Sequence, residues 1–146
     1  MDLSDPLIRV TAMPSDTNPY GGVFGGWLMS QLALGAGALA SREGQGKAVV
    51  VSATDFAFPG TMAVGDELSV YGAVERLGRT SITITTEAIA RERNGDTTTL
   101  VASGKFKFVL LDDDDKPRPV RAAGELGESI EGSDHAEAAN SNSRPS

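Results

Sequence analysis

The hydrophobic pattern of the chain changes period once. Over residues 25–42 apolar side chains lie on every side of a helical wheel, and Ser30 and Gln31 are the only polar breaks before Ser41. A helix that is apolar all round is a buried helix. From residue 48 the period becomes 2, which predicts strands over 48–58, 67–78, 79–93 and 100–111. A short extended segment, "PLIRVTAMP", precedes the helix and ends at Pro14.

The predicted strands have no second helix between them. They should therefore be antiparallel and mostly joined to their sequence neighbours, and Asn94-Gly95 favours a turn before the last one. One apolar helix and four or five long strands predict an α+β domain. In it the sheet wraps around the helix, and the side left open is closed by another subunit. A plain α+β sandwich is the alternative.

Charge divides the chain into two parts. Its 146 residues suit one domain, and of the net charge of -7, a balance of -5 falls in residues 112–146. We therefore predict a domain over 1–120 and a disordered acidic tail over 121–146. The nearly neutral domain has no basic field for nucleic acid. No apolar run approaches the roughly 20 residues of a membrane span, and the first residues lack signal-peptide features. We expect a cytoplasmic protein without a membrane partner.

The composition restricts the available chemistry. There is no cysteine, and the single histidine, His135, lies in the polar tail. These two facts argue against a Ser-His-Asp triad, a Cys-His pair, a thiolate metal site and a histidine-based zinc site. We expect no metal ion. Carboxylates, hydroxyls, amides and backbone dipoles remain as catalytic groups.

Four segments carry a family resemblance. In order, "DTNPYGGVFGGWLMSQ", "AVGDELSVYG", "LGRTSITITTEA" and "KPRPV" resemble the hotdog-fold acyl-CoA thioesterases, in particular the YciA-like acyl-CoA hydrolases, and the likeness spans about residues 8 to 120. It implies a hotdog fold, an antiparallel sheet of five or six strands around one long central helix. It also implies hydrolysis of acyl-CoA to a free fatty (carboxylic) acid and CoA, with no cofactor beyond the CoA of the substrate. Family members form homodimers that assemble further, often to hexamers.

The resemblance gives the glycines at the helix start a role. Gly25 and Gly26 open the helix where free N–H groups and the positive end of the helix dipole converge. A thioester carbonyl can approach these amides as in an oxyanion hole, which makes Gly26 a catalytic candidate and places Phe24 and Gly25 at the substrate. Ser30 and Gln31 are natural companions to the carbonyl or to water. Alternatively, the glycines only allow close packing, and neighbouring backbone satisfies the two polar side chains.

The sequence departs from the family at the residue that aligns the hydrolytic water. Gly22 stands where the family has an acidic or amide residue, and Ala33 stands at a second acidic position. Positioned acid–base catalysis contributes roughly 10² to 10⁴-fold, so a catalytically weak acyl-CoA-binding protein of the same fold is the alternative. The candidate substitutes are Asp55, in an otherwise apolar strand, and Asn18. Alternatively, Asp55 lies on the solvent face of its strand or pairs with an arginine. Asn18, in the same way, would only hold the loop by hydrogen bonds.

For CoA, the resemblance points to two clusters that supply cations and hydroxyls, namely Arg79, Thr80 and Ser81, and Lys116 and Arg118. Phosphate groups require such cationic forks and hydroxyl donors. Without the resemblance, the first cluster would only start a strand and the second would be a solvated linker.

Overall fold

The structure, a computed structural model, describes residues 5–120. The predicted tail and His135 lie outside the described residues. Within that range the elements, in chain order, are β1 (Ile8–Thr11), the 3₁₀ turn η1 (Pro14–Asp16), α1 (Gly25–Gly44), β2 (Ala48–Ala57), β3 (Glu67–Leu77), β4 (Ser81–Arg91) and β5 (Thr98–Leu110). The predicted helix and the four long strands are confirmed, with boundaries that agree to within two residues.

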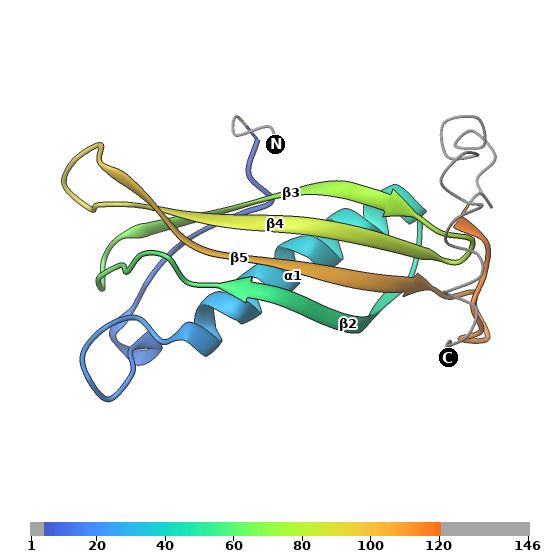
Figure 1. The fold of residues 1–146 in the computed structure, drawn as a ribbon, viewed down its shortest axis with the longest axis horizontal. Coiled ribbons are helices and arrows are strands. Elements are labelled where there is room, and N and C mark those ends of the chain that lie inside the picture. Colours follow the sequence, from blue (N-terminus) through green and yellow to red (C-terminus); the bar gives the residue numbers. More distant parts are fainter. Residues whose placement is uncertain (1–4, 121–146) are drawn as a thin grey trace.

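The strands form one antiparallel sheet in the order β1-β3-β4-β5-β2. The consecutive strands β3, β4 and β5 are neighbours, as predicted. β2, which follows the helix, instead pairs with β5 at the far edge, with Val49 opposite Val109. The long helix α1 lies across one face of this sheet (Figure 1). No helix within residues 5–120 has the length and apolar character needed to cross a membrane.

Alternation of buried and partly exposed positions along most of β4 and the middle of β5 gives the sheet two different faces. Ile82, Ile84, Phe106 and Phe108 are buried and belong to the core beneath the helix. The positions between them are polar, as in the Lys-Phe-Lys-Phe run of residues 105–108, and point to the opposite, outer face. The helix supplies Leu28, Leu32, Gly35, Ala36, Leu39, Ala40 and Gly44 to its buried side.

The sheet covers only one side of α1. Leu34 is 61% exposed, and Met29 is also exposed. In a single protomer, α1 is therefore apolar on all sides but buried on only one of them. This uncovered strip is the side that we expect another subunit to close.

The two edges of the sheet differ. β1 is four residues long and carries Arg9, whose Nε lies 3.8 Å from Glu67 Oε1. β2 is ten residues long and exposed at all but two positions, including its consecutive valines 49–51. No strand within residues 5–120 pairs with its free edge. A long apolar edge strand of this kind is a template for pairing with another chain.

Candidate active site

A tight loop, residues 17–23, leads into the helix. The N–H of Asn18 donates to Gly22 O at 2.7 Å, and Asn18 Oδ1 accepts from the N–H groups of Tyr20 (2.8 Å) and Gly22 (3.2 Å). Gly21 has a φ of 100°, which suits glycine. The amide oxygen of Asn18 therefore holds the loop, in agreement with the second interpretation of this residue.

The N-terminus of α1 has no side-chain cap. Phe24 is the N-cap residue, and its carbonyl accepts from the N–H groups of Trp27 and Leu28 at 3.0 and 3.2 Å. No described residue accepts from the N–H of Gly25 or Gly26. The first turn contains no acidic residue either, so the positive end of the helix dipole is not compensated there.

The two glycines at this helix start have different steric surroundings. A Cβ added to Gly26 would lie 2.4 Å from the ring of Phe24, so a side chain at this position would require that half-exposed ring to move. A Cβ on Gly25 would meet only the ring of Phe58, at 3.8 Å, which is an ordinary contact. Position 26 is therefore crowded by the ring of Phe24, whereas position 25 has room for a methyl group within the protomer. Phe24 (52% exposed) and Phe58 (45% exposed) form an apolar rim beside the free amides.

The remaining candidates near the helix start have mixed surroundings. A Cβ on Gly22 would lie 3.7 Å from Asn18 Nδ2, so the loop has room for a side chain at this position. Ser30 Oγ donates to Trp27 O at 2.8 Å, which agrees with satisfaction by neighbouring backbone. Gln31 is partly buried on the same turn of the helix.

Asp55 lies at an irregularity of β2 and faces away from the helix. Its φ is 58°, and the register of β2 against β5 shifts between Thr54 and Ala57. The carboxylate is 70% exposed and lies 3.7 Å from Lys105 Nζ, whereas the next residue, Phe56, packs edge-on against Phe106. The position of Asp55 matches its solvent-face interpretation, with a lysine in the place of the expected arginine.

The structure brings the CoA candidates together at one end of the sheet. The N–H of Leu110 donates to Thr80 O at 3.0 Å, and the N–H of Val120 donates to Arg79 O at 2.8 Å. Arg79 is exposed, but Thr80 and Ser81 are buried, and Ser81 Oγ has no hydrogen-bond partner within the described part of the chain. Of Arg79, Thr80 and Ser81, Arg79 is therefore the one that is accessible in a single protomer.

The segment after β5 closes the C-terminal end of the helix. Arg118 donates from Nη2 to Gly44 O at 2.6 Å and from Nε to Leu111 O at 3.1 Å. A cation on the last helical carbonyls compensates the negative end of the dipole. Arg118 therefore has a structural role in the protomer, whereas Lys116 is exposed.

The acidic run before Lys116 has local partners. The backbone N–H of Lys116 donates to Asp112 Oδ1, as does that of Asp114, and these hydrogen bonds lower the pKa of the Asp112 carboxyl. Asp115 forms a hydrogen-bonded ion pair with Lys47, which raises the pKa of that lysine.

In one protomer, the candidate residues for catalysis and those for CoA binding thus lie far apart. The helix-start residues lie at one end of α1, and the CoA candidates lie beside its other end, next to Gly44. A helix of 20 residues is about 30 Å long. Sequence reasoning missed Phe58, although its position directly after the apolar strand "SATDFA" placed it near the helix start.

The five-stranded antiparallel sheet with one long helix and the uncapped helix start agree with the resemblance to the hotdog-fold thioesterases, and comparison with known proteins supports this class. A family model described as "Thioesterase superfamily" matches residues 20–96. An uncharacterized acyl-CoA thioester hydrolase of Zymomonas mobilis is 43% identical over 113 residues, which cover 77% of this chain and 76% of that protein. The acyl-CoA thioester hydrolase YciA of Salmonella typhimurium is 38% identical over 122 residues, covering 81% and 91%.

A solved structure extends the likeness to three dimensions. Cj0915, described as a hexameric hotdog fold thioesterase of Campylobacter jejuni, superimposes with a TM-score of 0.80 at 30% identity, covering 90% of this chain and 99% of that one. The chain belongs to the thioesterase superfamily, and the resemblance inferred from its motifs is confirmed.

Proposed function

We propose that this protein hydrolyses acyl-CoA to a free carboxylic acid and CoA at the N-terminus of α1. The observation that carries the proposal is the uncapped helix start, where the N–H groups of Gly25 and Gly26 have no acceptor among the described residues. The two relatives compared above bear the name of acyl-CoA thioester hydrolase, which supports the substrate class.

The reaction needs few groups. The thioester carbonyl oxygen accepts hydrogen bonds from the amides of Gly25 and Gly26, and these bonds strengthen as negative charge develops on that oxygen. The oxygen of water then bonds to the acyl carbon, the carbon–sulfur bond breaks, and the sulfur of CoA takes up the proton released by water. The apolar rings of Phe24 and Phe58 border this region and would exclude solvent from it once the acyl chain covers them, which would increase the strength of the electrostatic interaction.

Activation of the water is the weak step. Gly22 has no side chain, and in the protomer Asp55 faces the outer side of the sheet. Asn18 has an amide nitrogen directed toward the space at position 22, and we infer that it orients water there. An amide does not accept a proton at neutral pH, so hydrolysis should be slow. The same observation favours the second candidate function, an acyl-CoA-binding protein with little turnover.

We further propose that a second copy completes the site. Antiparallel pairing of two β2 strands would continue the sheet from one protomer to the next, and a two-fold axis would run the two helices in opposite directions. The CoA candidates beside Gly44 of one copy would then approach the helix start of the other. Assembly of such dimers to a hexamer is the further proposal, supported by the hexameric Campylobacter jejuni protein. A cytoplasmic location stays a prediction from the sequence.

The test is release of free thiol from a panel of acyl-CoA substrates, combined with a separate measurement of CoA binding. Slow turnover is expected from the natural protein. Gly22→Asp should raise the rate by roughly 10² to 10⁴-fold, the contribution of a positioned base. Gly22→Leu is the matched control, because it adds a side chain of similar size that has neither a carboxylate nor an amide. Tight binding with no turnover of any acyl-CoA would reject hydrolysis in favour of the binding function.

The predicted role of Asp55 as the base is tested in the same assay. If its carboxylate only pairs with Lys105, Asp55→Asn should leave the rate within a few-fold of the natural one. Loss of turnover with unchanged CoA binding would instead identify Asp55 as the base, supplied across a subunit interface.

A further inference from the structure

The ring of Phe58 lies beside the free amides of the helix start. Two of its carbons lie 3.8 and 4.0 Å from the position of a Cβ on Gly25. Because N and Cβ are each one bond of about 1.5 Å from Cα, the nearest ring carbon lies within about 7 Å of the Gly25 nitrogen. The carbons that follow a carbonyl group bound at this amide are therefore within reach of the ring.

The backbone on both sides of Phe58 is fixed by packing. Two residues earlier, the ring of Phe56 packs against Phe106, with ring centroids 5.5 Å apart and an interplanar angle of 77°. Two residues later, a Cβ on Gly60 would lie only 2.7 Å from the backbone oxygen of Leu100, so the loop lies directly against β5. The ring of Phe58 itself is 45% exposed. An apolar ring that is exposed but held in position suits contact with a ligand.

The two segments that meet at the helix start contribute no charged side chain. Residues 17–41 and 56–65 contain no Asp, Glu, Lys, Arg or His, and the residues directly before them, Asp16 and Asp55, are acidic. The first basic residue that follows, Arg42, lies in the last turn of α1. An acyl group with a terminal carboxylate would find no cation among these residues, and removing an unpaired charge from water is costly.

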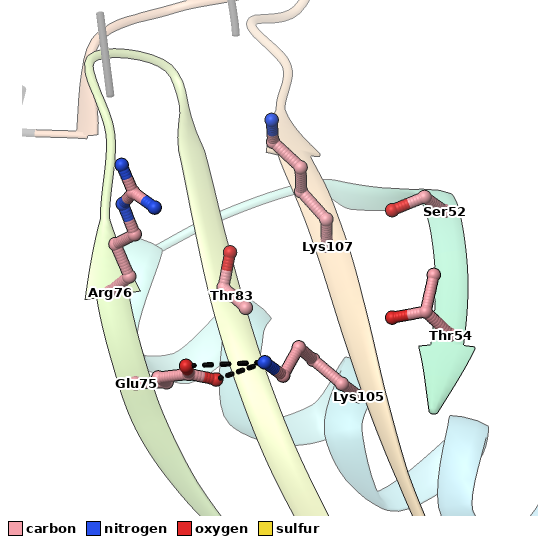
Figure 2. A pocket seen from close by; sticks show the side chains of 7 residues that line it. All are labelled: Ser52, Thr54, Glu75, Arg76, Thr83, Lys105 and Lys107. Carbon is pink, nitrogen blue, oxygen red and sulfur yellow. Dashed lines mark hydrogen bonds and ion pairs between the residues drawn. The ribbon is translucent and has the colours of Figure 1, made fainter. Parts of the chain in front are cut away.

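The charged side chains of the neighbouring strands lie on the opposite, outer face of the sheet. Lys105 Nζ lies 3.3 Å from Glu75 Oε1 and 3.7 Å from Asp55 Oδ2, so this lysine is paired with acidic groups on that face. Figure 2 shows the charged residues around an outer-face pocket of about 200 Å³, namely Glu75, Arg76, Lys105 and Lys107. The helix side of the sheet, where Phe58 meets Gly25, is apolar by comparison.

We propose that Phe58 determines the acyl specificity of the site. It selects an uncharged aliphatic chain of several carbons over acetyl and over a chain with a terminal carboxylate. The proposal rests on the hydrolytic function proposed above, because it takes the thioester carbonyl to be bound at Gly25. The ring packs against the carbons after the carbonyl, and each methylene in contact adds apolar area removed from water. Met29, which is 37% exposed and one helical turn after Gly25, extends this apolar surface along α1.

Thiol release by the full chain from hexanoyl-CoA, adipoyl-CoA and acetyl-CoA tests the proposal. The hexanoyl and adipoyl chains have the same length and differ in the terminal carboxylate, whereas acetyl lacks the chain. Discrimination by one methylene in a hydrophobic pocket is roughly 10 to 200-fold. In the natural protein, kcat/KM for hexanoyl-CoA should therefore exceed each of the other two at least about tenfold.

Substitution of Phe58 should change this preference. Phe58→Ala should lower kcat/KM for hexanoyl-CoA at least about tenfold and that for acetyl-CoA less than about threefold, because acetyl has almost no chain to lose contact. Phe58→Leu should restore most of the preference. Phe58→Lys supplies the missing cation and should raise kcat/KM for adipoyl-CoA relative to that for hexanoyl-CoA.

Val64→Ala is the matched control. Val64 is also exposed, at 43%, and lies in the same loop between β2 and β3. The next residue, Gly65, donates its N–H to Ala12 O at 2.8 Å, away from the helix start. The three kcat/KM values should therefore stay as they are in the natural protein.

Two results with Phe58→Ala would overturn the proposal. An equal decrease of kcat/KM for hexanoyl-CoA and acetyl-CoA would show that the ring serves only the structure. An unchanged preference, together with a changed elution volume on gel filtration, would show that a second copy covers the ring. If the natural protein hydrolyses no acyl-CoA, the hydrolytic function fails on its own. The Kd values of hexanoyl-CoA and acetyl-CoA then replace kcat/KM, and the effect of Phe58→Ala on their ratio decides the proposal.

Discussion

Replacing Gly25 by alanine separates a catalytic role of the helix start from a packing role. The added Cβ would lie 3.8 and 4.0 Å from two ring carbons of Phe58, so it fits without displacing a neighbour. In the middle of a helix alanine is favoured over glycine by roughly 0.5–1 kcal/mol, and the first helical position keeps at most part of this advantage. The variant should therefore melt at the same temperature as the natural protein or at a higher one.

The same methyl group would stand beside the amides that the thioester oxygen must reach, within about 3 Å for a hydrogen bond. Loss of one such donor costs roughly 10² to 10³ in kcat, or about 2.7–4 kcal/mol. We expect Gly25→Ala to lose at least about a hundredfold in kcat, measured by thiol release, while circular dichroism shows an unchanged or raised Tm.

Gly26→Ala is the contrasting variant. Its Cβ would lie 2.4 Å from the ring of Phe24, so this half-exposed ring must move away from the helix start. We expect kcat to decrease while Tm changes little. Full kcat in Gly25→Ala would refute the placement of the carbonyl at these amides. A parallel decrease of kcat and Tm in Gly25→Ala would show that the glycine serves packing, in contradiction to the catalytic interpretation.

The remaining predictions concern assembly, the helix C-terminus and acid. Val51→Lys puts a charge on the exposed edge strand β2 and should yield a smaller species on gel filtration with unchanged circular dichroism; an unchanged elution volume would exclude pairing through β2. Arg118→Gln removes the cationic donor to Gly44 O and should lower the stability by about 1 kcal/mol, seen as a decreased Tm. Because hydrogen bonds lower the pKa of Asp112, their contribution is present above the unfolded value of about 3.9 and is lost as the pH falls through the folded pKa. The NMR shift of the 116 amide should therefore change only in acid, and a change near neutral pH would contradict this.

The sequence predicts those features that depend on local periodicity. The alternation of lysine and phenylalanine over residues 105–108 identifies both the strand and its buried face, and the apolar stretch 27–40 identifies the central helix. The family motifs, in turn, identify the helix start as the site before any coordinates are considered.

Other features depend on contacts between distant residues and were not predictable in this way. β2 pairs with β5 rather than with β3, its neighbour in sequence. The partner of β2 depends on where the end of the helix places the start of this strand relative to the sheet. The left-handed backbone of Asp55 interrupts the alternation that its strand suggests. Arg118 reaches Gly44 across 74 positions, and nothing in "KPRPV" indicates a helix cap.

The uncapped start of α1 has a consequence for engineering. Serine, aspartate or asparagine at an N-cap stabilises a helix by about 0.5–2 kcal/mol relative to alanine, yet Phe24 occupies this position. A hydroxyl or carboxylate there would accept from the backbone amides of the first turn and fill the place intended for the substrate oxygen. Selection for thermal stability alone would therefore favour polar replacements of Phe24. The resulting variants would be stable but would no longer hydrolyse acyl-CoA.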